Sequence, residues 1–243
     1  MEKQPEKRGL VVAAHPDDAE FGAGGTTALL SNDQWEMHYL VLTDGSKGTE
    51  DPTLQSTLVG IREKEQKKAS EVLNVKTCSF AGATDGELEY ARDYLGAIVK
   101  AIRTVKPHTI LTHSPDIVRR HTQLFQDPQD PLSTYHASIN HRDHRLTGEM
   151  TLDAVYPTAR DILNFPEHIQ EGLTTHKVKE VWLWGTHATN YNVDITQTID
   201  LKIKALKCHA SQVNEEQIDQ FKERLKDKDG TYYERFQRIV LTY

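Results

Sequence analysis

The sequence predicts an α/β fold in which a mostly parallel sheet is covered by helices on both faces. Short apolar runs alternate along the chain with segments of helical spacing, and this alternation is typical of parallel sheets. The first of these runs, residues 9–14, contains no charged side chain, as expected for a strand buried on both faces.

The elements follow from their patterns in chain order. Residues 57–73 combine dense Lys and Glu with one apolar stripe, which indicates an exposed helix. The helix over 90–105 is expected to stop before Pro107, and the short strand that follows ends at His113. The expected strands are 9–14, 36–43, 75–80, 109–112, 178–184, 191–195 and 236–241. The expected helices are 26–32, 57–73, 90–105, 141–159 and 196–211, with a charged helix after residue 214.

Residues 114–140 form the one long segment without a convincing period. They contain three prolines and many polar side chains, and loops of this length are often binding loops or lids. The loop also carries His121 and His136, for which an exposed position is favoured over a ligand role. The chain shows no internal repeat, so residues 1–243 are expected to form a single domain with this loop at its active site.

Composition excludes several classes of protein. The net charge of −7 argues against binding to nucleic acid or to an anionic membrane surface. No apolar run approaches the roughly 20 residues needed to span a bilayer, and the N-terminus lacks the pattern of a signal peptide. The two cysteines, Cys78 and Cys208, are too few for a disulfide framework. We therefore expect a cytoplasmic protein.

A histidine and a group of carboxylates follow the first strand directly. Residues 15–20 read His-Pro-Asp-Asp-Ala-Glu, at the carboxyl end of a strand, where ligands bind in open α/β sheets. Imidazole and carboxylate are natural ligands of a zinc-like ion, and His15 and Asp18 are spaced so that both can face one point. The alternative is that Asp17 or Asp18 caps the following helix.

A second cluster, residues 141–144, reads His-Arg-Asp-His where the long loop becomes a helix. One ligand from this cluster would complete a three-ligand site with an open position, the arrangement typical of catalytic zinc. The alternative is a solvated helix start. Because both clusters fall at predicted element ends, a joint metal site is favoured.

The two clusters resemble the motifs of the PIG-L/LmbE family of zinc-dependent N-acetylglucosaminyl deacetylases. The likeness continues through Thr43-Asp44-Gly45, Arg62, the turn at residues 85–88 and the stretch 193–212, so that it covers roughly residues 9–213. Within the family, the approach to residue 193 looks most like the diacetylchitobiose deacetylase branch. The resemblance implies a Rossmann-like open sheet, a homo-oligomer (trimer or hexamer) and a small N-acetylated sugar as the substrate.

The resemblance also implies roles for individual residues. One Zn²⁺ per subunit would be bound by His15, Asp18 and His144. Asp17 would be the general base. A protonated His141 would stabilise the tetrahedral intermediate, with Asp143 as the orienting partner of that histidine. Arg62 would contact the substrate, although a structural salt bridge with Glu63 or Glu65 is a close alternative.

One departure from the family pattern lies in the second cluster. The family usually has proline where this chain has Arg142, which makes the placement of His141 less secure than that of His144. A non-catalytic metal- or sugar-binding module on the same fold is therefore the alternative function. A nicotinamide enzyme is disfavoured, because Gly22, Gly24 and Gly25 do not have the GxGxxG spacing.

Overall fold

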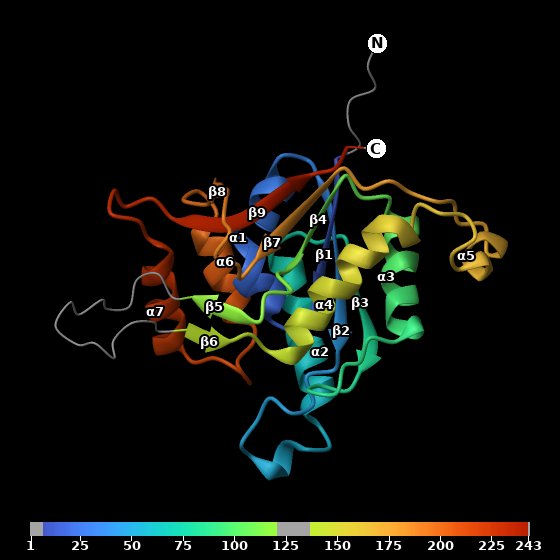
Figure 1. Cartoon of the computed structure of the whole chain (residues 1–243). Helices are drawn as coiled ribbons and strands as arrows, with labels where there is room; N and C mark the ends of the chain where they lie inside the picture. The colour runs from blue at the N-terminus through green and yellow to red at the C-terminus, as the bar shows by residue number, and fades with distance from the viewer. Residues whose placement is uncertain (1–6, 121–136, 243) are drawn as a thin grey trace, which may run out of the picture.

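One seven-stranded sheet contains strands from both ends of the chain. The structure is a computed structural model that describes residues 7–120 and 137–242. The strand order is β3-β2-β1-β4-β7-β9-β8, and β5 pairs with β6 in a separate hairpin (Figure 1). The strands are β1 (Arg8–Ala13), β2 (Glu36–Thr43), β3 (Thr77–Ala83), β4 (Thr109–His113), β5 (Val118–Arg120), β6 (Ala137–Ile139), β7 (Glu180–Trp184), β8 (Tyr191–Asp194) and β9 (Tyr233–Val240).

The sheet is mostly parallel. Strands β3, β2, β1, β4 and β7 pair in parallel, in that order, whereas β9 pairs antiparallel with β7 and with β8. The strand-helix alternation in the sequence therefore predicted the fold class correctly. The antiparallel strands lie together at one edge, so they leave the parallel centre of the sheet intact.

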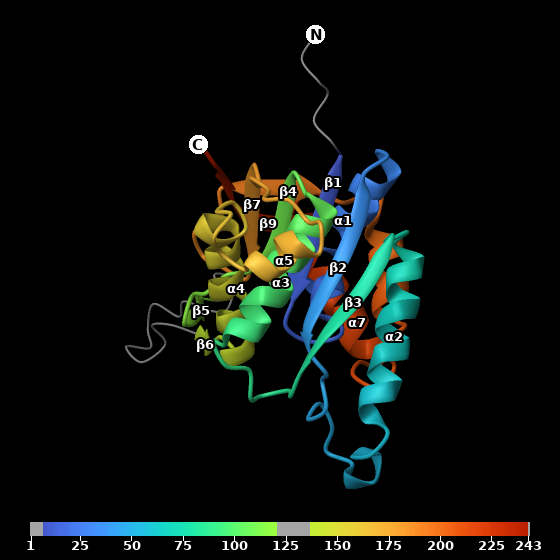
Figure 2. The same ribbon diagram turned by 90° about the vertical axis from the view of Figure 1, so that its right-hand side faces the viewer.

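Helices cover both faces of the sheet, as predicted. Figure 2 shows α2 and α7 on one side of the strands and α3, α4 and α5 on the other. None of the described helices is long and apolar enough to cross a membrane. The helices are α1 (Asp18–Asn32), α2 (Leu58–Val72), α3 (Arg92–Val105), α4 (Arg142–Asp153), α5 (Pro166–Gln170), α6 (Ile199–Leu206) and α7 (Glu215–Leu225), with a 3₁₀ turn η1 (Pro52–Leu54) and a π-helical segment η2 (Ala154–Thr158).

The central strand β1 supplies side chains to both hydrophobic cores. Val11 and Ala13 belong to the core under α1, α2 and α6, and Leu10 and Val12 belong to the core under α3 and α4. Successive side chains of a strand point to opposite faces, so a strand covered on both sides must be apolar throughout. This requirement explains the unbroken apolar run that marks β1 in the sequence.

The strand order reverses direction at β1. After β1 the chain adds β2 and then β3 on one side, and it returns to place β4 on the other side of β1. The carboxyl ends of β1 and β4 therefore flank a topological switch point, where open α/β sheets bind their ligands. Both clusters predicted from the sequence converge at this point.

The start of α1 and the segment 114–140 differ from the sequence expectation in ways that bear on the site. Helix α1 begins at Asp18 rather than at residue 26, because a helix packed under the sheet accommodates the glycines at 22, 24 and 25. A Cβ on Gly22 would lie 2.5 Å from the ring of Trp184, so the glycine permits close packing. The expected loop 114–140 contributes the β5–β6 hairpin. Its histidines 121 and 136 lie outside the described residues.

Candidate metal centre and active site

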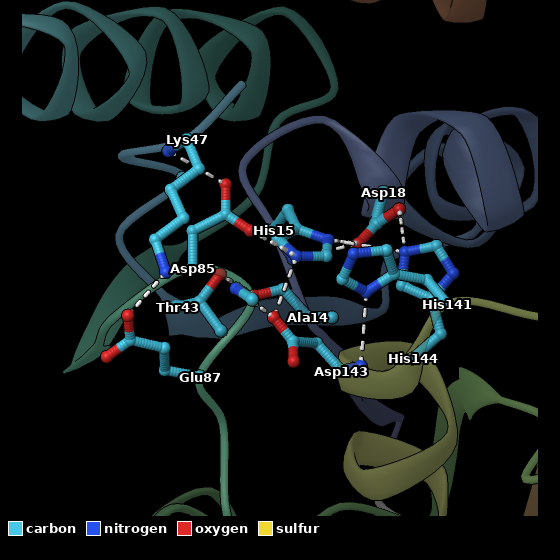
Figure 3. A network of polar contacts seen from close by, with 12 residues as sticks. Ala14, His15, Asp18, Thr43, Lys47, Asp85, Glu87, His141, Asp143 and His144 are labelled. Atoms are coloured by element: carbon cyan, nitrogen blue, oxygen red, sulfur yellow. Dashed lines mark hydrogen bonds and ion pairs between the residues drawn. The ribbon is translucent and has the colours of Figure 1, made fainter. Parts of the chain in front are cut away.

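The donor atoms of three residues form a compact group at the switch point. His15 Nδ1 lies 3.1 Å from Asp18 Oδ2 and 3.2 Å from His144 Nε2, and His144 Nε2 lies 3.2 Å from Asp18 Oδ1. A tetrahedral zinc ion with bonds of roughly 2.0–2.1 Å requires ligand atoms about 3.4 Å apart. The donor set and its spacing therefore fit a zinc-like ion. We call these three residues the metal triangle (Figure 3).

The second ring nitrogen of His15 faces away from the triangle, towards two further carboxylates. Its Nε2 is 3.1 Å from Asp85 Oδ1 and 3.2 Å from Asp143 Oδ2. In the neutral ring, Nε2–H would donate to these acids and leave the Nδ1 lone pair facing the triangle, the arrangement that orients metal-binding histidines. Burial lowers the pKa of His15, but the hydrogen bonds to the three surrounding carboxylates outweigh it and raise the pKa to about 12.

Another imidazole, that of His113 at the end of β4, lies beside the triangle. Its ring stacks on His144 with centroids 4.3 Å apart, and its Nε2 lies 3.4 Å from Asp18 Oδ2. Burial raises the pKa of Asp18, but the neighbouring His144 and His113 outweigh burial and hold it well below the usual range. His113 was not among the predicted site residues, although a histidine at the end of a buried strand beside the switch point was a usable signal.

Asp17 adopts a backbone conformation that is rare for residues other than glycine. Its φ is +114°, and it occupies the N-cap position of α1 without a capping hydrogen bond from its side chain. Such conformations cluster at functional sites, where the surroundings hold them in place. Here the carboxylate accepts a hydrogen bond from Arg62 Nη2 at 3.1 Å, and the backbone N–H donates to Gln66 Oε1 at 2.8 Å.

The pKa of the Asp17 carboxyl is raised to near neutral pH. Burial, together with the negative charge of Asp18, raises the pKa of Asp17 to about 7, although Arg62 acts in the opposite direction. A carboxyl group with a pKa near 7 can both accept and return a proton at neutral pH.

Arg62 lies behind Asp17. The residue is 3% exposed, and its guanidinium donates to the carbonyls of Gly45 and Pro16 as well as to Asp17. In this structure Arg62 contacts the predicted general base, and its expected contact with a substrate stays a prediction. The alternative was a salt bridge with Glu63 or Glu65, whereas the ion pair in the structure is with Asp17.

A buried chain of polar side chains continues from Asp17 into the protein. Gln66 Nε2 donates to Glu20 Oε1 at 2.9 Å, and His209 Nε2 lies 3.2 Å from Glu20 Oε2. All three side chains are fully buried. The motif alone left Glu20 without a role. In the structure Glu20 is linked through Gln66 to the backbone of Asp17. We call Gln66, Glu20 and His209 the support chain.

His141 and Asp143 are arranged differently from the expectation. His141 is the N-cap of α4, where its Nδ1 accepts a hydrogen bond from the backbone N–H of Asp143. A ring nitrogen that accepts carries no proton, so His141 is neutral here rather than protonated. Burial and the charge of His15 also lower its pKa. The Asp143 carboxylate contacts His15 and the N–H of Gly86 instead.

The arginine that replaces the family's proline does not disturb this helix start. Arg142 is the first residue of α4. At this position the backbone N–H has no intrahelical partner, so proline and other residues are both accommodated. The helix consequently presents His141 and His144 to the site without the proline.

Comparisons with known proteins agree with this geometry. The PIG-L: GlcNAc-PI de-N-acetylase family matches residues 10–155. The chain belongs to this family. It is 32% identical to a diacetylchitobiose deacetylase of Thermococcus kodakarensis, over 86% of this chain and 72% of that protein.

Solved structures share the fold over nearly the whole chain. An N,N'-diacetylchitobiose deacetylase from Pyrococcus horikoshii, in complex with its inhibitor, superimposes with a TM-score of 0.81 at 29% identity, covering 98% of this chain and 85% of that one. A 4-carboxy-2-hydroxymuconate hydratase from Pseudomonas putida has a TM-score of 0.74 at 21% identity, covering 98% of both chains. The second likeness concerns the fold alone.

Proposed function

We propose that this chain is a zinc-dependent hydrolase that removes the acetyl group from an N-acetylglucosamine-type sugar, giving acetate and a free amine. The proposal depends chiefly on one observation, the metal triangle next to a strained aspartate whose pKa is raised to about 7. The diacetylchitobiose deacetylase relative supports the acetamido sugar as the substrate class.

The metal triangle would hold one zinc ion per subunit. When bound, such an ion polarises a carbonyl group and lowers the pKa of water toward roughly 7. After loss of the Nδ1 proton of His15, the two carboxylates on Nε2 would hold the Nε2–H and keep the ring in the tautomer whose Nδ1 lone pair is free to bind.

Asp17 would act as the general base. Its carboxylate would take a proton from the attacking water and then deliver that proton to the amine nitrogen as the C–N bond breaks. General acid–base assistance of this kind contributes about 10²–10⁴-fold to the rate. Arg62 and Gln66 would fix the side chain and the backbone of Asp17, respectively.

His141 would bind the oxygen of the reacting carbonyl. Because its Nδ1 accepts from the backbone of Asp143, the ring would offer its Nε2–H as a neutral donor to the developing oxyanion. A single donor in this role contributes about 10²–10³-fold. Asp143 would then orient His15 through its side chain and His141 through its backbone.

The test combines metal analysis with product detection. The purified protein is assayed for zinc content and for acetate and amine release from N-acetylglucosamine and its dimer. We expect release by the wild type and almost none by a zinc-loaded Asp17→Asn variant. Unchanged turnover in that variant would refute the role of Asp17, and zinc without release from either sugar would favour a binding module. The homo-oligomer and the cytoplasmic location stay predictions.

A further inference from the structure

Two cavities of different character lie near the metal triangle. One, of about 390 Å³, reaches Asp18 and is lined by Phe21, Gly22, Trp184, Phe221 and Leu225. We call it the apolar cavity. The other, of about 410 Å³, is lined by Thr84, Glu87, Glu89, Tyr94 and Arg142, the last of which adjoins His141. We call it the polar cavity. A substrate with one polar and one apolar part could place each part in a matching cavity.

Glu234 and Arg235 line the edge of the apolar cavity, and the polar groups there already have partners. Arg235 Nη2 donates to Asp227 Oδ2 at 3.0 Å. The Glu234 carboxylate accepts hydrogen bonds from Lys202 and from the backbone N–H groups of Gly25 and Thr26. The Trp184 indole N–H donates to His113 Nδ1. A sugar ring entering this cavity would lose the water bound to its hydroxyls with few partners in return, which is unfavourable. A hydrocarbon chain has no such requirement.

The apolar cavity is also larger than an acetyl group needs. A water molecule, which is similar in size to one methylene group, takes a share of about 30 Å³ of liquid volume. A cavity of about 390 Å³ therefore has room for several methylene groups beyond the acetyl methyl. Aromatic walls form much of this room, with Phe21 and Phe221 packed edge to face at 4.9 Å.

The polar cavity has the properties that a sugar requires. Its carboxylates, guanidinium and phenol can donate to and accept from ring hydroxyls. This cavity adjoins the site, because the N–H of its lining residue Gly86 donates to Asp143 Oδ2, which lies 3.2 Å from His15 Nε2. The apolar cavity reaches the metal triangle through Asp18.

We propose that the apolar cavity binds the acyl chain of the substrate, and that the enzyme hydrolyses N-acyl glucosamines with chains longer than acetyl. The inference rests on the proposed hydrolytic function. The sugar occupies the polar cavity, and the amide lies at the metal triangle between the two. Each methylene buried in the apolar cavity should raise kcat/KM by about fourfold until the cavity is full.

The test compares N-acetyl-, N-butyryl- and N-hexanoylglucosamine as substrates of the zinc-loaded enzyme, with amine release as the readout. We expect kcat/KM for the hexanoyl substrate to exceed that for the acetyl substrate by at least tenfold. Leu225→Trp, which narrows the apolar cavity, should reduce kcat/KM for the hexanoyl substrate at least tenfold and change the acetyl value by less than threefold. Glu223→Trp, on an exposed position of the same helix, is the matched control and should change neither.

Calorimetric binding of the same ligands separates this inference from the proposed function. A wild type that releases amine from the acetyl substrate but neither binds nor cleaves the hexanoyl substrate would overturn the acyl cavity and leave the hydrolase intact. An equal loss on both substrates in Leu225→Trp would also overturn it, since the sugar would then occupy the cavity. Affinity that rises with chain length, without amine release from any substrate, would support the cavity and refute the hydrolase.

Discussion

Replacing Gln66 by leucine should weaken the fold as well as the site. The substitution removes the acceptor for the Asp17 N–H and a donor to the Glu20 carboxylate, at 2.8 and 2.9 Å in the buried support chain. Each buried group left without a partner costs about 1–3 kcal/mol. The loss in unfolding free energy should therefore be about 2–6 kcal/mol, or roughly 4–24 °C in Tm at about 2–4 °C per kcal/mol.

A double substitution provides the matched control. With Gln66→Glu and Glu20→Gln together, the new glutamine can donate to the new glutamate, which still accepts from the Asp17 N–H. His209 can still donate to the new glutamine, so every hydrogen bond of the support chain is retained. Gln66→Glu alone places two carboxylates within contact distance and should be strongly destabilising. We expect the second substitution to recover most of that loss.

Thermal and urea unfolding of the four proteins measure the effect, with acetate release measured in parallel. The reasoning would be refuted by a change below 1 kcal/mol in Gln66→Leu, or by a double variant no more stable than Gln66→Glu alone. Because the support chain holds the backbone of Asp17, turnover should fall in Gln66→Leu even at temperatures where the variant is fully folded.

Three further outcomes are expected. Asp143→Asn removes a carboxylate from His15 and should weaken zinc affinity 10–100-fold in competition with a chelator, and an unchanged affinity would contradict that orienting role. Zinc binding at pH 7 should release at least one proton per ion, because the pKa of about 12 keeps metal-free His15 protonated until the ion displaces the proton. Calorimetry in two buffers of different ionisation enthalpy measures this release. Gly148→Ala would place a Cβ 2.3 Å from the His113 carbonyl oxygen, so its Tm should fall well below that of Gly60→Ala, where the Cβ meets open space.

The buried centre of the fold was predictable because its physical requirements are strict. Strand β2 was predicted with its observed bounds, since its run from Tyr39 to Leu42 is continuously apolar, as expected for a strand covered on both faces. The start of α1 was missed, because the glycines at 22, 24 and 25 have low helix propensity and their close packing against Trp184 and Ile195 is a tertiary effect. The end of α4 was placed too late, since the π-helical segment η2 follows it.

The candidate site also has a part that was predictable from the sequence and a part that was not. The spacing of His15 and Asp18 predicted that both side chains face one point, and the second cluster supplied His144 as a third candidate ligand. The partners of these residues come from elsewhere in the chain: Asp85 from the turn after β3, His113 from β4, and Gln66 from α2. Only the sheet topology brings them to one point. For this reason the orienting roles of Arg62 and Asp143 could not be assigned from residue type and spacing.

The metal triangle also joins distant parts of the chain, since His15 and His144 are separated by 129 positions. An ion held by both would act as a cross-link that closes a very long loop, a constraint whose effect on the unfolded chain grows with loop length. Binding to the folded state alone adds stability that depends on the free metal concentration. Metal supply would then set the survival of the protein against proteolysis as well as its activity, and starvation for metal would deplete the enzyme itself.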